Sequence, residues 1–168
     1  MTTTSVHEGE GLTEGMILAT AFPSAYNSSM VVKDEEGLRD ILTTARVIAV
    51  VGLSSDRTRP SYDVASYLQQ AGYQIIPVNP NETEVLGVPA VASLLELEGQ
   101  TIDLVDVFRR PADVLPHAME AIAIGARTLW LQKGVHHDEA VRRASAAGLR
   151  VVSNRCTMRD HARLLGRR

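Results

Sequence analysis

Residues 47–62 have the sequence VIAVVGLSSDRTRPSY. The first five residues are apolar and mostly β-branched, which is typical of a strand buried on both faces of a parallel sheet. Gly52 and a polar loop follow, and Pro60 stands where proline is favoured, in the first turn of a helix. The unpaired N–H groups and the dipole of such a helix start attract anions. This stretch therefore predicts a strand, a loop of phosphate-binding size and a helix N-terminus.

The same unit of helix, glycine, strand and polar loop recurs along the chain. Gly72, Gly125 and Gly148 each stand where a helix C-terminus favours a left-handed residue. Apolar spacing predicts helices at 35–45, 60–71, 90–97, 111–124 and 137–147, a last helix opened by a Thr157–Asp160 capping box, and strands at 46–53, 73–78, 102–108, 128–132 and 149–152. This alternation predicts a Rossmann-like, doubly wound α/β domain: a mostly parallel sheet of five or six strands with helices on both faces.

Length and composition restrict the class of protein. The chain has 168 residues, a net charge of −3 and one cysteine, Cys156. A single domain follows from the length, and one cysteine excludes an internal disulfide, so we expect a reducing, cytoplasmic location. No stretch approaches the roughly 20 apolar residues of a membrane span, and no basic segment leads into an apolar run as in a signal peptide. We expect no membrane association; a homo-oligomer stays open.

The N-terminal segment differs in composition from the rest. Residues 1–33 are rich in Thr, Ser, Gly and Glu, with a short apolar patch at 16–19. We expect residues 1–33 to form a flexible or peripheral arm and residues 34–168 to form the domain.

Polar and cationic residues follow the predicted strands. In a parallel sheet these positions meet at the carboxyl edge, where ligands of doubly wound sheets bind. The predicted edge carries donors and cations with Asp56 as its only acid, which suits a multiply phosphorylated ligand. The residues are Gly52, Ser54, Ser55, Arg57, Arg59, Ser61, Asn79, Pro80, Asn81, Phe108, Arg109, Arg110, Pro111, Gln132, Lys133, Gly134, Ser153, Asn154, Arg155 and Cys156.

The residues of the loop after the first predicted strand limit which nucleotide could bind. A dinucleotide fingerprint needs three glycines and an acid at the end of the second strand, but this loop has Gly52 alone and the strand ends in Asn79. NAD is therefore disfavoured. A Walker A lysine motif is absent as well, which argues against ATP hydrolysis. Coenzyme A and NADP, which carry an extra ribose phosphate, both remain open.

A series of short motifs resembles a known family. In chain order they are Gly52-Leu53-Ser54, Arg59-Pro60-Ser61-Tyr62, Gly72-Tyr73, Pro77-Val78-Asn79-Pro80, Leu86-Gly87, Val107-Phe108-Arg109, Trp130-Leu131-Gln132-Lys133-Gly134 and Arg155-Cys156. Together they resemble the small stand-alone CoA-binding proteins of bacteria, which are similar to the CoA-binding, Rossmann-type domain of the succinyl-CoA synthetase α-subunit. The resemblance covers residues 34–166. Ser153-Asn154 depart from it, since Met-Asp is more frequent there.

The resemblance implies a site for coenzyme A. The loop 52–55 and Ser61 would hold the pyrophosphate beside Arg59, residues 79–80 would flank the ribose and its 3′-phosphate, and residues 108–111 would border the adenine. Residues 132–134 would lie toward the pantetheine arm. The predicted contacts are Gly52, Leu53, Ser54, Ser55, Arg59, Pro60, Ser61, Asn79, Pro80, Phe108, Arg109, Arg110, Pro111, Gln132 and Gly134. A bulky residue at Gly52 would then abolish binding while leaving the fold intact.

A binding or regulatory module without catalysis is the expected function. The synthetase's ligase chemistry uses a second domain and a partner subunit that the resemblance does not include, so only binding is carried over. One alternative is a small enzyme that uses NADP or a CoA thioester, with Cys156 or Asp106 as its reactive group. Another is an interaction protein that has no ligand. Asp106 itself is expected to be a hydrogen-bonded structural carboxylate.

Other chemistries receive little support from the sequence. No Ser-His-Asp order with a nucleophile elbow occurs, and no His or Cys cluster has metal-ligand spacing. Residues 155–168 contain five arginines without interleaved aromatics. We therefore expect a solvated helix face there rather than a nucleic-acid arm.

Overall fold

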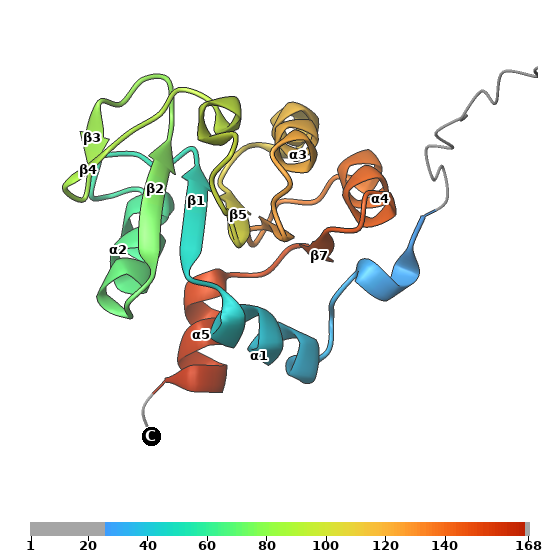
Figure 1. Ribbon diagram of the computed structural model, residues 1–168. Helices are drawn as coiled ribbons and strands as arrows, with labels where there is room; N and C mark the ends of the chain where they lie inside the picture. The colour runs from blue at the N-terminus through green and yellow to red at the C-terminus, as the bar shows by residue number, and fades with distance from the viewer. Residues whose placement is uncertain (1–25, 167–168) are drawn as a thin grey trace, which may run out of the picture.

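The central element is a five-stranded parallel sheet. The structure is a computed structural model that describes residues 26–166 (Figure 1). Its strands are β1 (Val47–Val51), β2 (Gln74–Val78), β5 (Leu104–Val107), β6 (Thr128–Leu131) and β7 (Arg150–Val152). They run in the order β2-β1-β5-β6-β7, and every neighbouring pair is parallel. The doubly wound α/β prediction is confirmed, with five strands in the sheet.

Helices cover both faces of the sheet. On one face lie α1 (Glu35–Thr44), α2 (Pro60–Gln70) and α5 (Thr157–Leu165), and on the other lie α3 (Val114–Ala123) and α4 (Asp138–Ala146) (Figure 1). Each face has its own hydrophobic cluster. In β1, Ile48 and Val50 belong to the α1–α2–α5 cluster, and Ala49 and Val51 belong to the other. This explains why the strand is apolar at every position.

The strand order reverses at β1. The chain passes from β1 to β2 on one side and later enters β5 on the other side of β1. A short antiparallel pair, β3 (Glu84–Val85) and β4 (Val88–Pro89), lies in the long connection between β2 and β5. Connections that leave in opposite directions open a crevice between the carboxyl ends of β1 and β5. This topology fixes where a ligand site can form.

Two predicted helix boundaries are wrong. Residues 90–97 form only a 3₁₀ turn at Leu94–Leu97, because Val91 instead forms a parallel bridge with Val78 at the edge of the sheet. The Thr157–Asp160 capping box does not form either. Cys156 is the N-cap residue of α5, and the Thr157 side chain donates to Asp106, while Asp160 pairs with Arg155. In both places a tertiary contact replaces the local pattern.

The end of the predicted N-terminal arm lies against the domain. Ser28–Met30 form a 3₁₀ turn, Val31 bridges Val151 of β7, and the Val32 N–H donates to the Val151 carbonyl at 2.9 Å. Residues 1–25, which include the apolar patch at 16–19, lie outside the described residues. Within residues 26–166, no helix has the length and apolar character needed to span a membrane.

Candidate functional site

A cleft of about 940 Å³ lies at the carboxyl ends of β1, β2, β5 and β6. This is the position that the topology provides, at the reversal of strand order. Most of the side chains predicted from the sequence are brought together there. The predicted residues that line it are Gly52, Ser54, Arg59, Pro60, Ser61, Asn79, Phe108, Arg109, Arg110, Pro111, Gln132 and Gly134.

Three predicted residues do not line the cleft. Leu53 is fully buried in the hydrophobic cluster under α2. Ser55 is exposed, and both its N–H and its hydroxyl donate to Glu82 Oε1, at 2.8 and 3.0 Å. Pro80 is exposed on the turn after β2. Their proximity in sequence to lining residues made them candidates, but alternation and turn geometry direct their side chains elsewhere.

Gly52 is required by the fold itself. Its φ angle is +82°, and a Cβ atom at this position would lie 2.3 Å from the Phe108 carbonyl oxygen. Its N–H donates to the Val78 carbonyl at 2.8 Å, which joins the loop to β2. A side chain at residue 52 would therefore collide with backbone, and our expectation that a bulky substitution would leave the fold intact is wrong.

The loop after β1 is held by two of its predicted ligand contacts. Ser61 Oγ accepts a hydrogen bond from the Ser54 N–H at 3.2 Å. Asn79 is buried; its Nδ2 donates to the Leu53 carbonyl at 3.0 Å, and its Oδ1 accepts from the Asn81 N–H at 3.0 Å. The Asn79 amide is thus committed to shaping the loop and the turn beside the cleft.

The cleft is cationic, but it contains more acid than the sequence predicts. Its charged lining residues are Arg59, Arg109, Arg110, Lys133, Arg159, Asp63, Glu82 and Asp113. Arg110 Nε lies 3.0 Å from Asp113 Oδ2 in an exposed pair, as the sequence allowed. Asp56, the only acid expected at this edge, lies outside the lining and accepts from Thr58. Five cations against three acids still leave the lining positive, which attracts an anionic ligand.

Arg109 offers a donor that the protein does not use. Its Nε atom is buried and has no hydrogen-bond partner among the described residues. A buried unpaired donor costs free energy, and Arg109 lines the cleft next to Gly52. A ligand oxygen could satisfy this donor.

Glu82 accepts hydrogen bonds from groups of Ser55 that an anionic ligand would otherwise use. Its carboxylate accepts from the Ser55 N–H and hydroxyl in the loop that precedes α2. Glu82 also lines the cleft. The chain's own carboxylate thus takes the place beside the loop where the sequence predicts a phosphate.

A buried carboxylate lies beneath the cleft. Asp106, on β5, is fully buried and accepts from Gln132 Nε2 at 2.7 Å and from Thr157 Oγ1 at 2.9 Å. Burial raises its pKa to about 7, although both hydrogen bonds act to lower it. Asp106 is the hydrogen-bonded carboxylate that the sequence predicts, and it does not line the cleft.

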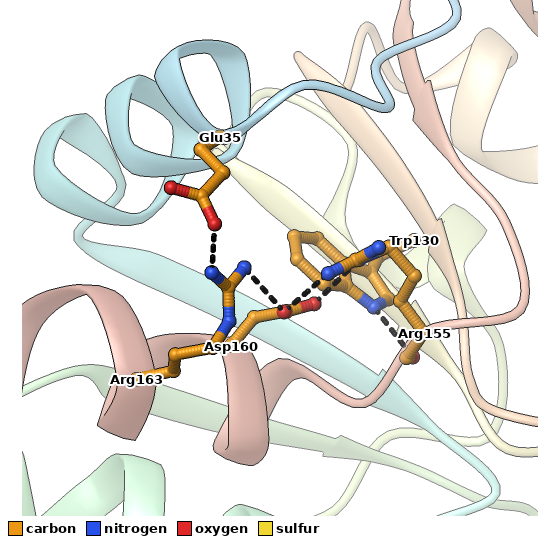
Figure 2. A network of polar contacts seen from close by, with 5 residues as sticks. All are labelled: Glu35, Trp130, Arg155, Asp160 and Arg163. Atoms are coloured by element: carbon orange, nitrogen blue, oxygen red, sulfur yellow. Dashed lines mark hydrogen bonds and ion pairs between the residues drawn. The ribbon is translucent and has the colours of Figure 1, made fainter.

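Two arginines of the C-terminal stretch take part in a network of hydrogen bonds and ion pairs within the protein (Figure 2). Arg155 donates to both oxygens of Asp160, at 2.7 and 2.6 Å, and its carbonyl accepts from Trp130 Nε1 at 2.8 Å. Arg163 pairs with Asp160 and with Glu35 of α1. This network fastens α5 to α1 and to the sheet, so these arginines are structural.

The residues that depart from the family resemblance join two loops. Asn154 has a φ angle of +57°, and its Oδ1 accepts from the Gly134 N–H at 2.7 Å. Ser153 Oγ and His136 Nδ1 lie 2.7 Å apart. Ser153 and Asn154 therefore connect the loop after β7 to the loop after β6, which borders the cleft.

Several lining residues were not among the predicted ligand contacts. Asn81, Lys133 and Cys156 were expected at this edge of the sheet because they follow predicted strands, but the family resemblance did not mark them as contacts. The lining residues that sequence reasoning missed altogether are Asp63, Val64, Glu82, Asp113, Val135, Met158 and Arg159. Met158 and Arg159 enter because the first turn of α5 reaches the cleft, which no local pattern indicates. The described residues contain no cluster of three or more potential metal ligands.

Comparison with known proteins places the chain among CoA-binding sequences. The family model described as "CoA binding domain" matches residues 46–162. The chain is 42% identical over 125 residues to the uncharacterized protein YneT of Bacillus subtilis, which covers 74% of this chain and 92% of that protein. It is 29% identical over 138 residues to the α subunit of the ADP-forming acetate–CoA ligase II of Pyrococcus furiosus, covering 74% of this chain but 30% of the subunit.

Solved structures agree with the observed architecture. A hypothetical protein from Pyrococcus horikoshii superposes with a TM-score of 0.77 at 40% sequence identity, covering 80% of this chain and 94% of that one. Such coverage at this identity indicates that the same strands and helices occur in the same order in both proteins.

Proposed function

The chain belongs to the CoA-binding domain family, and from this premise we propose that it binds coenzyme A, or an acyl-CoA, as a non-catalytic module. The ligand would lie in the cleft at the carboxyl ends of β1, β2, β5 and β6. The observation that carries the proposal is the location of this cationic cleft at the strand-order reversal, bordered by the loop after β1. Its volume of about 940 Å³ lies within the range of small-molecule sites.

The cleft offers separate groups for the parts of the ligand. Arg59 would hold phosphate oxygens, and the Ser55 N–H and hydroxyl would do so if the ligand displaced Glu82 from them. The unpaired Nε of Arg109 would take another anionic or carbonyl oxygen. Phe108 and Pro111 provide apolar surface that suits a base. The remaining predicted contacts, among them Gln132 and Gly134, would lie along the pantetheine arm.

Two residues are candidates for a reactive group: Cys156, which lines the cleft, and Asp106, on which the non-catalytic part of the proposal rests. This candidate base is enclosed by Gln132 and Thr157 and lies outside the cleft lining. A general base must reach the proton that it removes. Asp106 in this position supports the fold of the site rather than a proton transfer to a ligand.

Calorimetric titration of the full chain with CoA, dephospho-CoA and NADP tests the proposal. We expect saturable binding of CoA that weakens when the 3′-phosphate is removed. Tighter binding of NADP would favour the alternative of an oxidoreductase, and failure of all three ligands to bind would refute the proposed function.

Arg59→Ala, with a matched control, tests whether CoA binds in this cleft. Removing a charge-assisted hydrogen bond to phosphate should weaken CoA binding by about 1.5–3 kcal/mol, or roughly 10- to 150-fold. Arg127→Ala is the control, because the two side chains are 69% and 65% exposed and each lies near an aspartate. Arg127 precedes β6, at the amino edge of the sheet. Equal effects of the two substitutions would count against this cleft.

A further inference from the structure

Three side chains from separate elements form a closed hydrogen-bond triangle beneath the cleft. They are Asp106 of β5, Gln132 directly after β6, and Thr157, the first residue of α5. Gln132 Nε2 donates to Asp106 Oδ1 at 2.7 Å and to Thr157 Oγ1 at 2.8 Å. Thr157 Oγ1 in turn donates to Asp106 Oδ2 at 2.9 Å. All three residues are at least nine-tenths buried.

The triangle determines which way the Gln132 amide points. A primary amide has two N–H donors and one carbonyl oxygen, and an ionised carboxylate can only accept. Both donors of Gln132 are used inside the triangle, so its oxygen must point away from Asp106. Above about pH 7 Asp106 is ionised, and turning the amide over would then place its oxygen against a carboxylate oxygen, with no proton between them.

The Gln132 oxygen is left for the cleft. Gln132 is the one member of the triangle that lines the cleft. No described group donates to Oε1, and Oε1 is not among the buried polar atoms that lack a partner. The amide therefore offers the cleft an acceptor and keeps its donors inside the protein.

We propose that Asp106 and Thr157 are positioning residues that hold Gln132 with its carbonyl oxygen toward the cleft, where it accepts a hydrogen bond from a ligand N–H or O–H. This inference rests on the proposed function. In CoA such donors are the two amides and the hydroxyl of the pantetheine arm, the ribose 2′-hydroxyl and the amino group of adenine. A thioester or phosphate oxygen finds no donor in Gln132, so this residue selects for a neutral donor and not for charge.

Substitution of Asp106 by leucine tests the positioning. Leucine is close in shape but has no acceptor, so the Gln132 amide loses its carboxylate partner and is free to turn its oxygen away from the cleft. We expect Asp106→Leu to weaken CoA binding about tenfold, the effect of losing one well-made hydrogen bond. Thr157→Val keeps the shape of the threonine and leaves Asp106 with its charge. It should also weaken CoA binding. Thermal unfolding verifies that each variant is folded.

A double-mutant cycle separates positioning from general structural damage. Gln132→Met removes the amide oxygen at similar volume, and in this background Asp106→Leu should have no further effect on CoA affinity. Full additivity of the two substitutions would overturn the inference, because Asp106 would then act independently of Gln132.

A second ligand locates the donor on CoA. Adenosine 3′,5′-bisphosphate has the adenine amino group and the ribose 2′-hydroxyl but no pantetheine arm. If Asp106→Leu weakens only CoA, the donor belongs to the arm; if it weakens both ligands and the Gln132→Met background abolishes both effects, the donor belongs to the adenosine part. Wild-type protein that binds neither ligand would refute the proposed function instead.

The orientation itself can be measured without any ligand. In ¹⁵N spectra of the wild-type chain, both side-chain amide protons of Gln132 should be protected from exchange with water, and Asp106→Leu should remove this protection. Exchange as fast as that of an exposed glutamine in the wild-type protein would overturn the inference, whatever the result with CoA.

Discussion

Several single residues at the cleft hold the backbone of its loops in place, in addition to any contact with a ligand. Gly52, Ser61 and Asn79 are expected at this edge from their positions after strands and as ligand contacts from the family resemblance, and all three line the cleft. Each also makes a contact that the loop requires, through its backbone or its side chain. At this scale a residue type that suits ligand binding also suits a tight strand-to-helix turn, because both need small side chains and local donors.

Gly52→Ala should destabilise the protein by about 2–4 kcal/mol, because it combines strain at a positive φ with a collision against the Phe108 carbonyl. Unfolding in urea would measure the change. Gly148→Ala is the control: its φ angle is +89°, but nothing lies within 4 Å of the added Cβ, so a loss of only about 1 kcal/mol is expected. Equal losses would mean that backbone strain alone explains the glycine at residue 52.

Glu82→Gln should strengthen CoA binding about three- to tenfold. The carboxylate of Glu82 uses the Ser55 donors and adds negative charge to the cleft, and glutamine keeps the shape while weakening both effects. Titration at two salt concentrations measures the gain, which should shrink as salt screens the charge. Weaker binding in the variant would instead indicate that Glu82 accepts a hydrogen bond from a ligand hydroxyl.

At the scale of elements, α5 contributes both to the lining of the cleft and to the hydrogen-bond triangle beneath it. Its first turn brings Met158 and Arg159 to the cleft, and Thr157 completes the triangle with Asp106. Its later turns are fastened through Asp160 and Arg163 to Arg155 and α1 (Figure 2). The sequence predicted a helix here, but it placed the cap one residue too late and could not indicate what the helix contacts.

Asp160→Asn should lower the free energy of unfolding by about 1–2 kcal/mol. Asp160 is 5% exposed and accepts two hydrogen bonds from Arg155, which is itself one-third exposed, so solvent reduces the effect below that of a fully buried pair. Asp40→Asn, in the more exposed Asp40–Arg150 pair, should change stability by no more than about 0.5 kcal/mol. Denaturant unfolding compares the two, and a larger loss at Asp40 would contradict this account.

For the whole molecule, the buried Asp106 makes stability depend on pH. Its pKa rises from 3.8 in the unfolded chain to about 7 in the folded protein. Between these values the folded state binds more protons than the unfolded state, so stability falls as pH rises. The free energy of unfolding decreases by an amount on the order of 4 kcal/mol as pH rises from about 4 to about 7. Below this range Asp106 lowers stability very little, and above it the full decrease applies. Burial lowers the pKa of His117 and His161, which contributes the opposite slope.

Asp106→Asn should remove this part of the pH profile. We expect the unfolding free energy of the wild-type protein to decrease relative to that of the variant between pH 4.5 and pH 8. Because both proteins keep His117 and His161, their contribution cancels in the difference. A difference that stays constant across this range would mean that Asp106 has the same pKa in the folded and unfolded states.

Local sequence pattern determined the elements and the edge of the sheet where polar groups collect. Apolar runs such as 47–51 and glycines such as Gly72 act through periodicity and backbone freedom, which depend on neighbours in the chain. Parallel strands then bring every segment that follows a strand to the same edge. This is why most of the predicted contacts line one cleft, although their contact with a ligand remains a prediction.

Only the tertiary structure decided how the polar groups pair. Glu82 reaches Ser55, Gln132 reaches Asp106, and Thr157 closes the triangle across sequence separations of 27, 26 and 51 residues. Many carboxylates in the chain could have accepted the same donors, and no local pattern ranks them. The choice depends on strand order, on where α5 begins and on side-chain direction, because a hydrogen bond forms only when donor and acceptor come within about 3 Å in a suitable alignment.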